Sequence, residues 1–140
     1  GYPDPASERE ILRNRETAGV QEASAVEAAG VLELQSRARE VKVDDALVDY
    51  MMAVVERTRR HESLSLGVSP RGAQALYRAA QALALAGGRD YAIPDDVKRL
   101  VIPVFAHRIM INTRVALAQR PLELAERILT EILTDVEVPL

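Results

Sequence analysis

Cysteine is absent from this chain of 140 residues, and histidine occurs only twice. The absence of cysteine excludes disulfides, thiolate metal sites and cysteine nucleophiles, and it fits a reducing compartment. The two histidines, His61 and His107, are too few and too far apart in the sequence to indicate a metal centre. The sequence therefore predicts that the chain itself binds no metal.

Aromatic residues are also scarce, at 4% of the chain, with one phenylalanine and no tryptophan, whereas apolar residues make up 48%. Alanine and leucine supply much of the apolar content, and both favour helices. The length corresponds to one ordinary domain with a core of its own. We therefore expect an all-α fold that forms a single domain over residues 1–140.

Long apolar runs and an excess of basic residues are missing as well. No apolar run approaches the roughly 20 residues needed to cross a bilayer. The start "GYPDPASERE" lacks the basic and apolar regions of a signal peptide. A net charge of −3 offers no broad surface for phosphate backbones. We expect a cytoplasmic protein with no membrane span and no nucleic-acid partner.

Capping residues and prolines divide the chain into about five to six helices in a single bundle. Ser69 before Pro70, and Asp44 before an apolar stripe, are typical helix starts. Pro103 is expected to end or kink a helix. No strand-like alternation of apolar and polar residues competes with this interpretation. The expected helices cover 5–15, 25–39, Asp44 to about residue 60, 70–86, a segment that starts at Pro94 and contains the end or kink at Pro103, and a segment that starts at Pro121.

The sequence motifs of nucleotide hydrolysis are absent. No GxxxxGK[ST] loop occurs, and no apolar strand ends in an acidic pair that could hold magnesium. No serine lies in a nucleophile elbow, and helix capping explains most of the carboxylates. We therefore expect this chain, taken alone, to be inactive as an enzyme.

Arg71 is the residue that its local sequence explains least. It falls in the first turn of the helix that Ser69 begins, where unpaired N–H groups and the helix dipole favour negative charge. One explanation is an ion pair with a neighbouring carboxylate, for which Asp90, Asp95 and Asp96 are the candidates.

The other explanation of Arg71 is an external anion. A phosphate would combine with the exposed N–H groups of the helix start and with the arginine charge. Gln74 and Arg78 share the polar side of the same helix and would extend the binding surface. From the residues alone, the ion pair and the anion site stay open as equals.

Three segments occur in an order that is longer and more specific than any short motif. They are "GYPDPASEREIL" at the start, "GVSPRGAQALYRAAQALALAGGRDYAIPDDVKRLVIPVFAHRI" in the middle and "EVP" at the end. In these segments the chain resembles the C-terminal helical lid of MoxR-type AAA+ ATPases, from Tyr2 to Pro139. The resemblance implies that an upstream ATPase domain is missing from this sequence and that residues 1–4 are the hinge segment that joins it to the lid.

The resemblance also implies roles for particular residues. The sensor-2 arginine of the family falls in "SPR", which is Arg71 here, and it would act as a catalytic residue by reaching the terminal phosphates of ATP. The "GYP" segment of the family borders the adenine, which implies nucleotide binding by Tyr2 and Pro3. Gln74 joins Arg71 as a candidate ligand of the same nucleotide. ATP and its magnesium ion would be held mainly by the missing domain.

The partners and the process are likewise implied by the resemblance. We expect a homo-oligomeric ring, a hexamer, that does chaperone-like remodelling or maturation of another protein. A von Willebrand factor A-domain protein is often a partner in this family. One position departs from the family pattern, because Ile93 stands where serine or threonine often caps the helix at "PDDV".

An alternative of a different class is a free-standing helical module that binds protein or DNA. The short, long and short helices around "PDDV" favour it, whereas the acidic net charge opposes DNA binding. A DNA titration separates the two hypotheses, because binding that weakens steeply with added salt would favour the module.

Overall fold

The computed structural model describes Asp4, Ala6 and residues 27–112 and 121–139. The chain divides into two compact units, residues 1–31 and 32–140. In the first unit, the Asp4 carboxylate accepts a hydrogen bond from the backbone N–H of Ala6 at 3.0 Å, as a helix-capping residue does. The remainder of the helix predicted over 5–15 lies outside the described residues.

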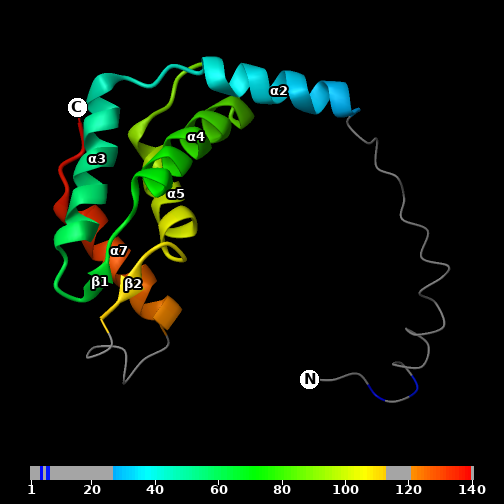
Figure 1. Cartoon of the computed structure of the whole chain (residues 1–140). Helices are drawn as coiled ribbons and strands as arrows, with labels where there is room; N and C mark the ends of the chain where they lie inside the picture. Colours follow the sequence, from blue (N-terminus) through cyan, green and yellow to red (C-terminus); the bar gives the residue numbers. More distant parts are fainter. Residues whose placement is uncertain (1–3, 5, 7–26, 113–120, 140) are drawn as a thin grey trace. The chain divides into compact units, whose positions relative to one another are not determined.

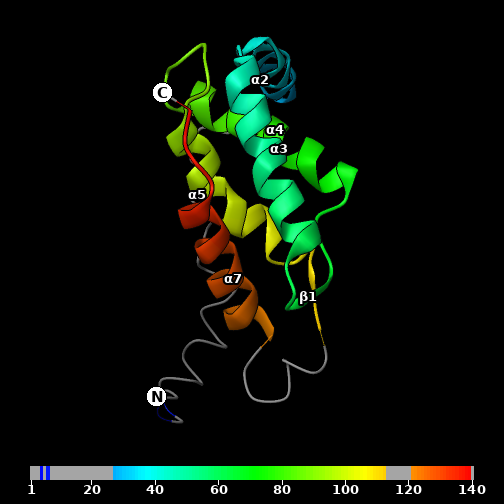
Figure 2. The same cartoon turned by 90° about the vertical axis from the view of Figure 1, so that its left-hand side faces the viewer.

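Four helices of the second unit form a closed bundle. They are α3 (Asp45–Arg60), α4 (Pro70–Ala86), α5 (Pro94–Phe105) and α7 (Pro121–Asp135). Each of α3 and α5 contacts both α4 and α7, so the four helices enclose one core (Figures 1 and 2). The largest fully buried apolar side chains of this core are Phe105, Leu76, Leu124, Leu129, Val54, Val55, Val68, Val97 and Val101. The predicted all-α bundle is confirmed.

The helix starts follow the capping pattern of the sequence. The Asp44 carboxylate accepts a hydrogen bond from Ala46 at 2.9 Å, and Ser69 Oγ accepts one from Gly72 at 3.2 Å. Pro70, Pro94 and Pro121 each occupy the first residue of a helix, where no N–H is needed. The predicted starts of α3, α4, α5 and α7 are therefore confirmed.

Of the two outcomes predicted for Pro103, a helix end and a kink, the helix end is wrong. Helix α5 continues through Pro103 to Phe105. Phe105 is fully buried in the core, and its burial favours two more helical residues over an earlier end. Tertiary packing here outweighs the loss of one backbone hydrogen bond at the proline.

A small antiparallel ribbon was not predicted. Strand β1 (Leu64–Leu66) pairs with β2 (Met110–Ile111) at one end of the bundle (Figure 1). Two or three residues per strand are too few to produce a visible alternation in the sequence. The ribbon connects the end of α3 to the end of α5 and leads the chain into α4.

Helix α2 (Ala28–Glu40) confirms the helix predicted over 25–39, but it contains no buried residue. Its end is fixed by Gln81 of α4, whose buried side-chain amide donates hydrogen bonds to the carbonyls of Arg39 and Val41. Lys42 then pairs with the backbone beside Tyr91 in a short parallel bridge. No helix within the described ranges has both the length and the apolar composition that crossing a bilayer requires.

Candidate anion-binding end of helix α4

The segment that leads into α4 is fixed to the last turn of α3. A β-carbon added at Gly67 would lie 2.6 Å from the backbone N and Cα of Arg59, so only glycine permits this close approach. The side chain of Val68 is 1% exposed. Its backbone N–H donates to Thr58 Oγ1 at 3.0 Å, and its carbonyl accepts from Arg59 Nε at 2.9 Å. The segment that leads into α4 therefore packs against α3 and makes its hydrogen bonds with α3.

The first turn of α4 is equally specified. Ser69 caps it, and Pro70 has no N–H to satisfy. Gly72 is buried, and a β-carbon there would lie 2.7 Å from Cγ1 of Val68. In "GVSPRG", every residue except Arg71 thus has a structural role.

Arg71 is exposed. Within the described part of the chain, neither its guanidinium nor its backbone N–H takes part in a hydrogen bond or ion pair. Two of the proposed carboxylate partners are engaged elsewhere, Asp96 with Arg89 and Asp95 with Lys98. The ion-pair explanation of Arg71 therefore finds no support in this structure, and anion binding stays the prediction.

Two further arginines flank the same helix start. Arg59 lies on one side through its bond to Val68. Arg108 lies on another, because a β-carbon on Gly72 would be 3.6 Å from its Cδ. Both side chains are exposed. The sequence shows no sign of this role for Arg59, because its contact with Val68 joins residues nine positions apart.

The structure describes two of the other residues that were predicted to bind the anion or the nucleotide. Gln74 is exposed, one turn beyond Arg71 on α4. Arg78 is already engaged, because it donates to Gln81 Oε1 at 3.0 Å and lies 5.8 Å from the ring centre of Tyr77. Tyr2 and Pro3 lie outside the described residues.

The start of α5 carries an ion pair that is distinct from this site and joins the buried Asp96 to the partly exposed Arg89. Both carboxylate oxygens of Asp96 accept from Arg89 at 2.7 Å, and Asp96 also accepts from the N–H of Ile93. The hydrogen bonds from Arg89 hold the pKa of Asp96 below its ordinary value and raise that of Arg89. Asp96 therefore makes one half of a capping box, whereas the Ile93 side chain has no acceptor for the other half.

Tyr50 is the one buried side chain among the described residues whose polar atom has no hydrogen-bond partner. Burial, and next the charge of Asp95, raise the pKa of its hydroxyl. The hydroxyl therefore stays protonated at neutral pH.

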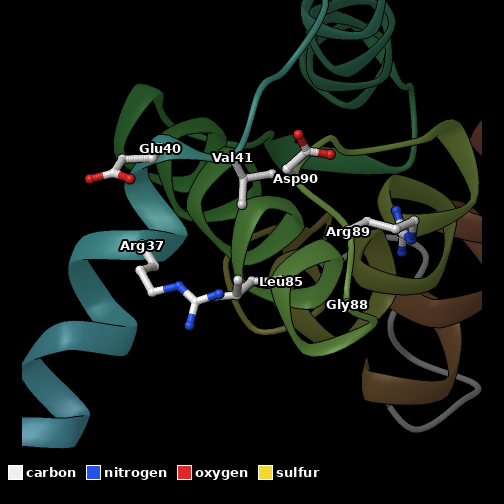
Figure 3. A pocket seen from close by; sticks show the side chains of 7 residues that line it. All are labelled: Arg37, Glu40, Val41, Leu85, Gly88, Arg89 and Asp90. Carbon is white, nitrogen blue, oxygen red and sulfur yellow. The ribbon is translucent and has the colours of Figure 1, made fainter.

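A pocket of about 320 Å³ lies at the other end of α4. Figure 3 shows its lining, which comes from the end of α2, from Leu85 in the last turn of α4 and from the loop after α4. Leu85 in this lining is 14 residues from Arg71, about 21 Å along the helix. The pocket is therefore too far away to belong to the candidate site. Within the described ranges, no three histidine, aspartate or glutamate side chains group in a way that could hold a metal ion.

Known proteins match both the sequence and the fold. A family model described as AAA lid domain matches residues 56–132. An uncharacterized protein of Bacillus subtilis, YeaC, is 37% identical over 99% of the chain. Chaperone MoxR1 of Mycobacterium tuberculosis is 37% identical over 80% of the chain, and protein MoxR of Paracoccus denitrificans is 52% identical over 33%.

A crystal structure of a candidate ATPase from Cytophaga hutchinsonii superposes over the whole chain with a TM-score of 0.74 and 26% identity. The chain spans 45% of that structure, 43% of the Bacillus relative and 32% of the mycobacterial one. The residues that match the lid family include "GVSPRG", which forms the candidate site, and also "PDDV" and "HRI". The chain belongs to the AAA lid domain family and is similar to the lid of MoxR-type AAA+ proteins.

Proposed function

We propose that the chain senses the nucleotide of its ATPase. In this proposal the lid closes over ATP that a separate domain binds together with magnesium, and Arg71 reaches the terminal phosphates. Gln74, one turn further on, lies beside the same nucleotide. The lid itself cleaves no bond, so the ATPase activity belongs to the whole protein.

One observation carries this proposal. Five of the six residues in "GVSPRG" build and fix the start of α4, whereas Arg71 presents its backbone N–H and guanidinium with no protein partner among the described residues. A guanidinium offers five N–H donors in a planar fork that matches phosphate oxygens. The helix dipole favours an anion at the same place. These donors fit an oxyanion, and a phosphate is the oxyanion that a nucleotide would present.

The wider setting rests on the relatives. Chaperone MoxR1 carries a chaperone name, and we extend that role to this chain as remodelling or maturation of a client protein. We further propose a ring, a hexamer, in which the lid passes the nucleotide state to neighbouring subunits. A von Willebrand factor A-domain partner and a cytoplasmic location complete the proposal on the family resemblance alone.

ATP turnover by the whole protein tests the role of Arg71. The substitution Arg71→Ala should slow turnover at least tenfold, about 1.4 kcal/mol in barrier height, because the charge on the terminal phosphates loses its partner. Arg127→Ala on α7 removes another exposed arginine and is the matched control, which should stay within twofold of the wild type. Unchanged turnover in Arg71→Ala would show that this arginine does not act on the nucleotide.

A further inference from the structure

We propose that Thr58 and Arg59 position Arg71. They are the last-turn residues of α3 that set where the sensing guanidinium stands relative to the nucleotide. This inference rests on the proposed function of Arg71. It gives these two side chains a function beyond the packing and charge of the last turn of α3.

Thr58 is a fully buried polar residue whose hydroxyl has two partners. Its Oγ1 donates to the carbonyl of Val55 at 2.6 Å within α3 and accepts from the N–H of Val68 at 3.0 Å. The first bond fixes the hydroxyl rotamer, so that a lone pair is aimed at Val68. The second bond crosses from α3 to the segment that begins α4.

Arg59 completes the attachment from the neighbouring position. Its Nε donates to the carbonyl of Val68 at 2.9 Å. Consecutive residues of α3 thus take both backbone polar groups of a single residue. Since Gly67 already lies against the backbone of Arg59, the segment can move neither toward α3 nor away from it without a clash or the loss of these bonds.

The distance from this attachment to the sensing arginine is short. Only Ser69 and Pro70 separate Val68 from Arg71, and both are conformationally restricted, one by its capping bond and the other by its ring. Val68 is further fixed against Gly72 inside the first turn. A displacement at Val68 is therefore carried into Arg71 rather than absorbed by a flexible loop. Errors of about 1 Å in the placement of a catalytic group can reduce rates a hundredfold.

A double-mutant cycle on the whole protein tests this inference through ATP turnover. Thr58→Val keeps the shape and removes the hydroxyl, and it should slow turnover about fivefold when Arg71 is present. In the Arg71→Ala background the same substitution should change turnover less than twofold, because the group that it misplaces is gone. Thr58→Ser restores the hydroxyl and should recover turnover to within twofold of the wild type.

An equal loss with Thr58→Val in both backgrounds would overturn the inference, because it would indicate a general effect on folding. No loss in either background, or no rescue by serine, would overturn it as well. If Thr58→Val does not fold, as judged by thermal unfolding, Arg59→Met provides the second route. It keeps an unbranched apolar stem and removes Nε–H at an exposed position, and it should slow turnover about threefold only when Arg71 is present.

The cycle also separates the two proposals. If Arg71→Ala alone leaves turnover unchanged, the proposed sensing function fails, and the positioning role fails with it. If Arg71→Ala slows turnover but the Thr58 and Arg59 variants do not, only the positioning role is wrong.

Discussion

At the scale of single residues, some features of "GVSPRG" can be predicted from the sequence, and others depend on contacts that exist only in the folded chain. The cap at Ser69 and the proline at position 70 depend on neighbours in the chain, and both were predicted. The need for glycine at 67 and 72 depends on Arg59 and Val68, which touch them only in the folded chain. Arg71 could be singled out from the sequence because its charge contradicts its position in the helix.

Gly67→Ala should destabilise the 140-residue chain by about 2–3 kcal/mol, because the added carbon overlaps backbone atoms that cannot rotate away. Gly72→Ala is the matched comparison. Its clash is with a side chain, and the gain in helix propensity of about 1 kcal/mol offsets part of the loss. Urea unfolding measures both. A Gly67→Ala chain that is more stable than the Gly72→Ala chain would contradict this account of the close approach.

At the scale of elements, a short connection joins α4 to α5, and the ion pair between Arg89 and Asp96 stabilises it. In the first turn of α5, the Asp96 carboxylate accepts a hydrogen bond from the N–H of Ile93, where the side chain of Ile93 offers no cap. Its partner Arg89 could not be identified in advance, because the pairing depends on the turn that Gly88 makes with a positive φ of 75°. The ribbon β1–β2 and the Gln81 bonds were missed for the same reason, since each joins residues that are more than 35 positions apart.

Asp96→Asn should destabilise the chain by about 2 kcal/mol near pH 7, since it weakens charged hydrogen bonds to Arg89 at a buried site. The folded state lowers the pKa of Asp96 below its ordinary value of 3.8. This stabilisation is therefore fully present above about pH 4 and is lost as the pH falls through the lowered pKa. Urea unfolding between pH 7 and pH 2 should show a constant difference in the free energy of unfolding between wild type and variant down to about pH 4. Below that pH the difference should shrink.

The control for this pH series is Asp95→Asn, whose carboxylate is 76% exposed and lies 3.9 Å from Lys98. An exposed pair of this kind should contribute less than about 0.5 kcal/mol at any pH. If the difference in the free energy of unfolding between wild type and Asp96→Asn stays the same down to pH 2, the ionised carboxylate is not the source of the stabilisation.

At the scale of the whole molecule, the sequence predicted the fold class, four helix starts and the lid family, because caps, prolines and long motifs are local and ordered. It could not predict how the helices position Arg71, because that depends on contacts of Thr58 and Arg59 across the bundle. The lid presents the donors of Arg71 at the start of α4. Its task in the proposal is completed only when a second domain delivers the nucleotide.

The most direct measurement of this central claim is the affinity of the whole protein for ATP and for ADP at equilibrium, with a non-hydrolysable analogue in place of ATP. A sensor of terminal phosphates should bind the triphosphate more tightly. Arg71→Ala should therefore weaken the triphosphate analogue at least tenfold, about 1.4 kcal/mol, and ADP less than threefold. Equal weakening of both nucleotides, or of neither, would contradict the assignment of Arg71 as the residue through which this lid senses ATP.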